Sequence, residues 1–138
     1  MKIRNGFVSN SSSSSFVVGF PKGLSKSEKK KILFDKMGVD KNSFFIIAAE
    51  EISKCILDSE HVKGEKGMLE YYGYDTMESF AEDYEWEYNT IKKALDKGFD
   101  LYLGSATNEG YEIGEALFCE MGWHVDDDDF VISKEESF

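Results

Sequence analysis

An amphipathic pattern between Thr76 and Lys97 constrains the fold of this chain more than any other feature. Its apolar residues recur at the spacing of one helical face, and they are Met77, Phe80, Ala81, Tyr84, Tyr88, Ile91 and Leu95. Asp75 and Glu78 form a capping box at the start, and a glycine follows the end. The pattern predicts one continuous helix over residues 76–97. Because its apolar stripe must be buried, we expect this helix to pack against a sheet or other helices.

Shorter apolar segments predict the remaining elements. Strands are expected at residues 16–20, 99–103, 123–125 and 130–132, the last two as a hairpin. Helices are expected at residues 25–37, 44–58 and 109–121, and residues 58–66 read as a loop. In the last helix we expect an inward face of Ile113, Ala116, Leu117 and Met121. The sequence therefore predicts an α/β or α+β fold for residues 16–138. It is a single compact domain in which three to four helices cover a small sheet of about four short strands.

A run of serines precedes the first predicted strand and consists of Ser11, Ser12, Ser13, Ser14 and Ser15. Serines bury little apolar surface, and their hydroxyls compete with backbone hydrogen bonding. We therefore treat residues 1–15 as a separate Ser-rich segment. Three interpretations stay open: a flexible spacer, a structured loop between two pinned apolar flanks, or a site of recognition or covalent modification.

The stretch from Asn5 to Val17 reads NGFVSNSSSSSFV. It resembles the N-terminal signature of small uncharacterised proteins from tailed bacteriophages and some bacteria. Residues Leu101–Ser105 and the end of the chain from Asp126 to Glu136 are similar to features that some of these proteins share. The resemblance implies a phage or bacterial origin and an unknown role, and it supplies no catalytic residues.

The formal net charge of -11 limits the classes of partner. Such a chain is not expected to bind nucleic acid or anionic membranes directly, because both attract Lys and Arg. The charge is consistent with solubility, with docking on a basic protein, or with mimicry of a nucleic acid. With no signal-peptide pattern, we expect a cytoplasmic protein, in the host cell if phage-encoded, or a virion component. Cys55 and Cys119 are then expected to be free thiols.

Trp86 is the candidate contact residue, since it lies about 180° from the apolar stripe of the predicted long helix. The acidic residues expected around it are Glu78, Glu82, Asp83, Glu85 and Glu87. An exposed Trp with a polar rim is typical of a protein contact, either with another protein or in a homo-oligomer. The alternative is that Trp86 lies under a neighbouring loop. The function that we expect is protein–protein interaction, as a host-modulating protein or a minor virion component.

Gly104, Ser105 and Thr107 form the second candidate site, because residues 104–110 are expected to join a strand to a helix. Ligands bind at such connections in α/β folds, and hydroxyls there can donate to a phosphate. The segment lacks the lysine and the glycine spacing of known phosphate loops. A plain helix start capped by Thr107 or Asn108 is therefore the alternative to a phosphate- or nucleotide-binding domain.

No catalytic residue, metal ligand or cofactor is expected from the sequence. Asp126–Asp129 are consecutive, so their carboxylates point in different directions, and their spacing matches no calcium loop. The chain has only two histidines, His61 and His124, and neither forms a recognisable Cys-His ligand pair with a cysteine. We therefore expect neither a zinc site nor a catalytic triad, and a binding role is favoured over an enzyme.

Overall fold

The computed structural model describes residues 13–110 and 112–135. Along the chain the elements are β1 (Ser13–Phe20), α1 (Lys26–Met37), α2 (Ile46–Leu57), β2 (Glu60–Val62), α3 (Gly64–Tyr72), α4 (Met77–Asp83), α5 (Glu85–Asp96), β3 (Asp100–Thr107), α6 (Ile113–Glu120), β4 (Trp123–Asp126) and β5 (Val131–Lys134). In these two ranges no helix is long and apolar enough to cross a lipid bilayer.

The strands form one open sheet in the order β2-β3-β1-β5-β4. Every neighbouring pair is antiparallel, so the fold is α+β and not a parallel α/β fold. The central strand β1 pairs with β3 along its whole length, from Ser13 opposite Thr107 to Phe20 opposite Asp100. The expected single compact domain and its mixed helix and strand content are confirmed, with five strands among the described residues and not about four.

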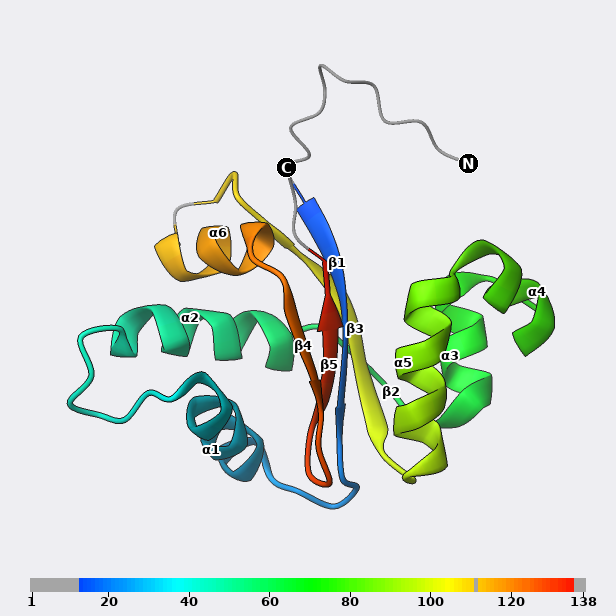
Figure 1. Ribbon diagram of the computed structural model, residues 1–138, viewed down its shortest axis with the longest axis horizontal. Helices are drawn as coiled ribbons and strands as arrows, with labels where there is room; N and C mark the ends of the chain where they lie inside the picture. Colours follow the sequence, from blue (N-terminus) through cyan, green and yellow to red (C-terminus); the bar gives the residue numbers. More distant parts are fainter. Residues whose placement is uncertain (1–12, 111, 136–138) are drawn as a thin grey trace.

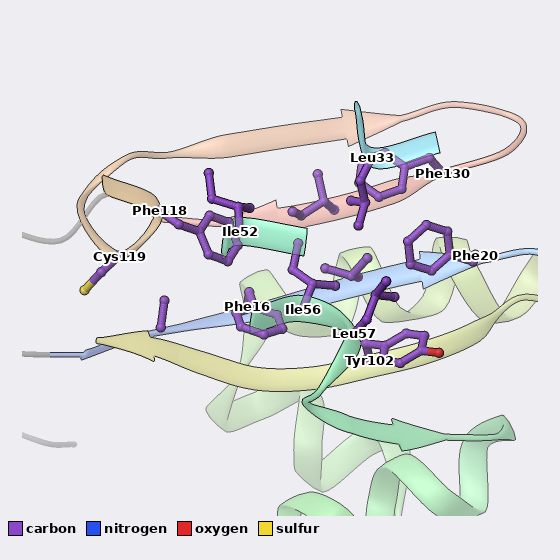
Figure 2. Packing of buried hydrophobic residues seen from close by; sticks show 13 residues of the cluster. Phe16, Phe20, Leu33, Ile52, Ile56, Leu57, Tyr102, Phe118, Cys119 and Phe130 are labelled. Carbon is purple, nitrogen blue, oxygen red and sulfur yellow. The ribbon is translucent and has the colours of Figure 1, made fainter. Parts of the chain in front are cut away.

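Helices cover both faces of the sheet, so the domain has three layers (Figure 1). Helices α1, α2 and α6 lie on one face, and α3, α4 and α5 lie on the other. Because successive side chains of a strand point to opposite faces, Phe16 and Val18 of β1 enter the first layer and Val17 enters the second. Figure 2 shows the first core, where Phe16, Phe20, Phe118 and Phe130 pack with apolar residues of α1 and α2.

Local capping explains where α1 begins and ends. The hydroxyl of Ser25 accepts a hydrogen bond from the backbone N–H of Glu28, and the carboxylate of Glu28 accepts one from the N–H of Ser25. This reciprocal pair is the predicted capping box. It lowers the pKa of Glu28, chiefly through the backbone hydrogen bond. Gly38 adopts the left-handed conformation and ends the helix, as expected from its position.

The prediction of one helix over residues 76–97 is wrong, because the chain breaks at Tyr84. This residue has φ -131° and ψ 60°, and it separates α4 from α5. The ring of Tyr84 lies 5.1 Å from that of Phe80, 5.3 Å from that of Tyr72 and 5.8 Å from that of Tyr74. This aromatic cluster, formed with α3, draws Tyr84 inward at a position where a straight helix would continue. In the apolar stripe Phe80 and Ile91 are buried in the core, and the other members are partly buried.

The loop predicted at residues 58–66 is also wrong, since β2 and α3 occupy this region. Strand β2 pairs Glu60–Val62 with Leu101–Leu103 at the edge of the sheet. An edge strand exposes polar side chains, and in β2 only Val62 is buried. Helix α3 is short and contains two glycines, which are poor helix formers, so its sequence resembled a loop. The split at Tyr84 and the presence of α3 raise the predicted four helices to six among the described residues.

The inward face predicted for the last helix is rotated from the observed one. Helix α6 begins at Ile113, and its buried residues are Gly114, Phe118 and Cys119. Ile113 and Leu117, expected in the core, are exposed. The reason is a close approach to α2: a Cβ placed on Gly114 would lie 2.5 Å from the carbonyl oxygen of Ala48. The absence of a side chain at Gly114 therefore sets which face of α6 meets the rest of the protein.

A buried lysine ties α6 to the sheet. The ammonium group of Lys134 in β5 donates to the carbonyl oxygens of Cys119 at 2.7 Å, Met121 at 2.5 Å and Glu135 at 2.7 Å. Two of these carbonyls belong to the C-terminal end of α6, where helix carbonyls lack intrahelical partners and carry partial negative charge. Lys134 thus caps the C-terminal end of α6 from inside the core.

Candidate functional site

Trp86 lies in the first turn of α5, and 62% of its surface is exposed. Its ring centroid is 6.2 Å from that of His124 in the edge strand β4. The two rings border a pocket of about 340 Å³ between α5 and the β4–β5 hairpin. Its other lining residues are Asn89, Thr90, Lys93, Val125, Asp126, Val131, Ile132 and Ser133. Trp86 therefore borders a pocket with both polar and apolar side chains that the sequence did not predict.

The acidic rim expected around Trp86 is divided by the break at Tyr84. Glu78, Glu82 and Asp83 lie on α4, whereas Glu85 lies with Trp86 on α5. None of these carboxylates lines the Trp86 pocket. Asp83 accepts a hydrogen bond from the hydroxyl of Tyr74, which raises the pKa of that tyrosine to about 12. The single acidic face predicted for one long helix is therefore absent.

Two polar side chains of the Trp86 pocket, Ser133 and His124, form a row with Glu135 beside it. The hydroxyl oxygen of Ser133 lies 3.2 Å from Nδ1 of His124, and Nε2 of His124 lies 3.3 Å from a carboxylate oxygen of Glu135. The sheet places them together, because His124 is directly opposite Ser133 in the β4–β5 ladder. Glu135 follows Ser133 by two residues and thus has its side chain on the same face. The sequence predicted the hairpin but not its register, and the register is what places His124 opposite Ser133.

Three residues of the serine run belong to the central strand. Ser13, Ser14 and Ser15 form the start of β1 and pair with Thr107, Ala106 and Ser105 of β3. They are neither a spacer nor a loop, and the strand begins before the expected domain boundary at residue 16. An enzyme that binds an extended peptide would have to break this pairing, so folding disfavours modification at Ser13–Ser15. Ser11 and Ser12 lie outside the described residues.

The predicted loop at residues 104–110 is wrong in its first half, because β3 continues to Thr107. Gly104 and Ser105 do border a pocket of about 730 Å³, together with Lys54. Four carboxylates line the same pocket, those of Asp58, Glu60, Glu112 and Glu115. The backbone N–H of Thr107 donates to Glu115 at 3.0 Å. Anion binding is disfavoured here, since a phosphate would face these negative charges.

The thiol of Cys55 also borders this acidic pocket, and it is a free cysteine. Burial, together with the nearby charges of Glu115 and Glu112, raises its pKa from 9.0 to about 12. At pH 8 the reactive thiolate should therefore be about 10³-fold rarer than in the unfolded chain. We expect iodoacetamide to alkylate Cys55 about 10³-fold more slowly in the native protein than in urea, as measured by peptide mass spectrometry. Comparable rates would show that the pocket does not hold Cys55 as a protonated thiol.

Most of the large exposed apolar side chains lie at one end of α2 and α6. The large hydrophobic side chains exposed in the described chain are Phe44, Phe45, Ile47, Tyr71, Trp86, Ile113 and Leu117. Five of these seven come from the start of α2 or from the outer face of α6. Ile47 and Ile113 each adjoin the contact between Ala48 and Gly114, and the rings of Phe44 and Phe45 are 5.4 Å apart. We call Phe44, Phe45, Ile47, Ile113 and Leu117 the apolar end.

The charges around the apolar end are mostly paired. Lys30 is 3.1 Å from Glu50, and Lys54 is 3.4 Å from Glu112. Glu51 accepts the backbone N–H of Gly114 at 2.7 Å. Two of the acidic side chains at this end, Glu50 and Glu112, are therefore neutralised by lysines. A group of large exposed apolar side chains on neighbouring elements is typical of a protein-binding surface.

Within residues 13–110 and 112–135, no group of three or more His, Cys, Asp or Glu side chains is arranged to hold a metal ion. Comparison with protein-family models, with curated proteins and with solved structures found no match for this chain. The expected phage or bacterial origin and the cytoplasmic or virion location stay predictions.

Proposed function

We propose that this protein works through protein–protein contacts made by the apolar end. One observation carries the proposal. Among the described residues seven large apolar side chains are exposed, and five of them lie at the apolar end. Phe44 is 92% exposed, Ile113 73% and Ile47 70%, values that leave most of each side chain in water. Monomeric proteins rarely keep such side chains together on their surface.

A second copy of the chain is the partner that we expect first. The net charge of -11 opposes self-association in general. At the apolar end, however, the ion pairs of Lys30 with Glu50 and of Lys54 with Glu112 reduce that repulsion locally. Helices α2 and α6 lie side by side at this end of the molecule (Figure 1), so two copies can bring the same two-helix surface together.

The apolar end is large enough for a reversible dimer. Burying a large apolar side chain contributes about 1.5–3 kcal/mol, so five from each copy supply at most about 15–30 kcal/mol. Association itself costs about 4–15 kcal/mol, and the side chains become ordered at further cost. The difference between the free energy gained by burial and the cost of association favours a dimer of moderate affinity over a permanent one.

Sedimentation velocity of the full chain tests this proposal. We expect a reversible dimer at about 100 μM. The double variant Phe44→Ser/Ile113→Ser should raise the dimer Kd by about 100-fold or more, because two buried apolar contacts are lost. Trp86→Ser is the matched control, since it removes an exposed apolar side chain elsewhere and should leave the Kd unchanged. A wild-type protein that stays monomeric, or a dimer that only Trp86→Ser disrupts, would overturn the assignment to the apolar end.

A further inference from the structure

We infer that Ser133, His124 and Glu135 form a hydrolytic site for small esters bound beside Trp86. This activity is separate from the proposed protein contact, because α5 and α6 cover opposite faces of the sheet. Ser133 is distinguished by its partner: its hydroxyl lies 3.2 Å from a histidine nitrogen. A serine beside a base, with the base oriented by a third group, is the arrangement that activates a hydroxyl as a nucleophile.

The two polar contacts of His124 assign a role to each of its ring nitrogens. Glu135 lies 3.3 Å from Nε2, and as an acceptor it favours the tautomer with the proton on that nitrogen. Nδ1 then has a free lone pair, which can accept the hydroxyl proton of Ser133. Glu135 thus acts as a positioning residue, because its carboxylate beside Nε2 orients the imidazole.

The strands hold this arrangement in place. Ser133 and His124 are directly opposite each other in the β4–β5 ladder, and Val17 of β1 pairs with Ser133 from the other side. Glu135 is anchored by its backbone, since its carbonyl accepts hydrogen bonds from Lys134 and from the hydroxyl of Ser14. Residues on paired strands keep their relative positions better than residues on loops.

The adjoining pocket supplies the other requirements for ester hydrolysis. The Trp86 ring forms an apolar wall against which an aryl or alkyl group can pack. Asn89 and Lys93 line the same pocket, and their N–H groups can donate to the negative oxygen that develops on the ester carbonyl. The volume of about 340 Å³ is at the lower end of the range for small-molecule sites.

The reaction requires only the ester and water. The Ser133 oxygen attacks the carbonyl carbon as its proton passes to Nδ1 of His124. The C–O bond to the alcohol then breaks, and the leaving oxygen takes that proton, which leaves an acyl group on Ser133. Water attacks this acyl group while His124 accepts a proton from the water. The acid departs as Ser133 recovers its proton from His124.

A fluorophosphonate probe tests the site in the full chain. The Ser133 oxygen attacks phosphorus and the P–F bond breaks, so a stable phosphonyl adduct forms. We expect one adduct, which peptide mass spectrometry places on Ser133. Ser133→Ala should abolish it, and His124→Gln should slow its formation by about 10²-fold or more, the usual contribution of a general base. Glu135→Gln should lower the maximal labelling rate and leave its half-saturating probe concentration unchanged.

Ser105→Ala is the matched control, because Ser105 is an exposed serine two strands away on the same face of the sheet. It should label like the wild type. Absence of an adduct on Ser133 in the wild type would overturn the inference without depending on any variant. Equal labelling of Ser133 in wild type and His124→Gln would also overturn it. Neither result bears on the dimer, which is measured separately by sedimentation.

Discussion

Lys134→Ala should lower the free energy of unfolding by about 3–5 kcal/mol. The substitution removes a fully buried side chain whose ammonium group binds the carbonyl oxygens of Cys119, Met121 and Glu135. Each buried polar group left without a partner costs about 1–3 kcal/mol, and the lost stem leaves a cavity beside Phe118. Urea denaturation followed by circular dichroism measures the effect.

Two comparisons separate the causes of this loss. Lys134→Met restores the stem and should recover the part of the stability that comes from packing, so its loss should be smaller than that of the alanine variant. Lys26→Ala removes an exposed lysine that lies 3.4 Å from Asp58, and it should change stability by less than about 1 kcal/mol. If Lys134→Ala and Lys26→Ala have equal effects, Lys134 does not hold the end of α6 as described.

Gly114→Ala should destabilise the protein although alanine is the better helix former. Helix propensity alone predicts a gain of up to about 1 kcal/mol. The added Cβ, however, would lie 2.5 Å from the Ala48 carbonyl oxygen and 2.8 Å from Cβ of Glu51. These are contacts with backbone and with the base of a side chain, so α6 must move away from α2. Overpacking of this kind costs about 1–3 kcal/mol or more, and we expect a net loss of about that size.

Gly110→Ala is the control for this prediction, because a Cβ at Gly110 would meet nothing within 4 Å. We expect its effect on unfolding to be within about 0.5 kcal/mol. Gly114→Ala should also weaken the proposed dimer, since it displaces Ile113 and Leu117 relative to α2. A Gly114→Ala variant that is as stable as the wild type would contradict the close helix contact.

Local signals predicted the parts of the fold that local chemistry determines. The capping box at Ser25 and the glycine after Met37 placed α1, and two short apolar segments on either side of an acidic turn indicated the hairpin. The break at Tyr84 was not predictable in this way, because it results from packing of its ring against α3 and Phe80. Strand β2 was missed since an edge strand needs few apolar residues.

The candidate surfaces depended still more on tertiary structure. A helical wheel placed Trp86 opposite the buried stripe, and its ring is exposed. The same reasoning assigned Ile113 and Leu117 to the core, whereas they form part of the apolar end. Their exposure follows from the close contact of Gly114 with Ala48, which sets the rotation of α6. A contact between two helices cannot be predicted from the periodicity of either sequence segment. The pairing of His124 with Ser133 likewise required the strand register.

Concentration-dependent NMR of the full chain tests the central claim, that the apolar end binds a second copy. Amide spectra at low and high protein concentration locate any contact residue by residue. We predict changes in peak position or width at residues 44–48 and 112–117, and none at residues 85–93 or 123–134. Changes confined to the Trp86 region, or identical spectra at both concentrations, would contradict the account.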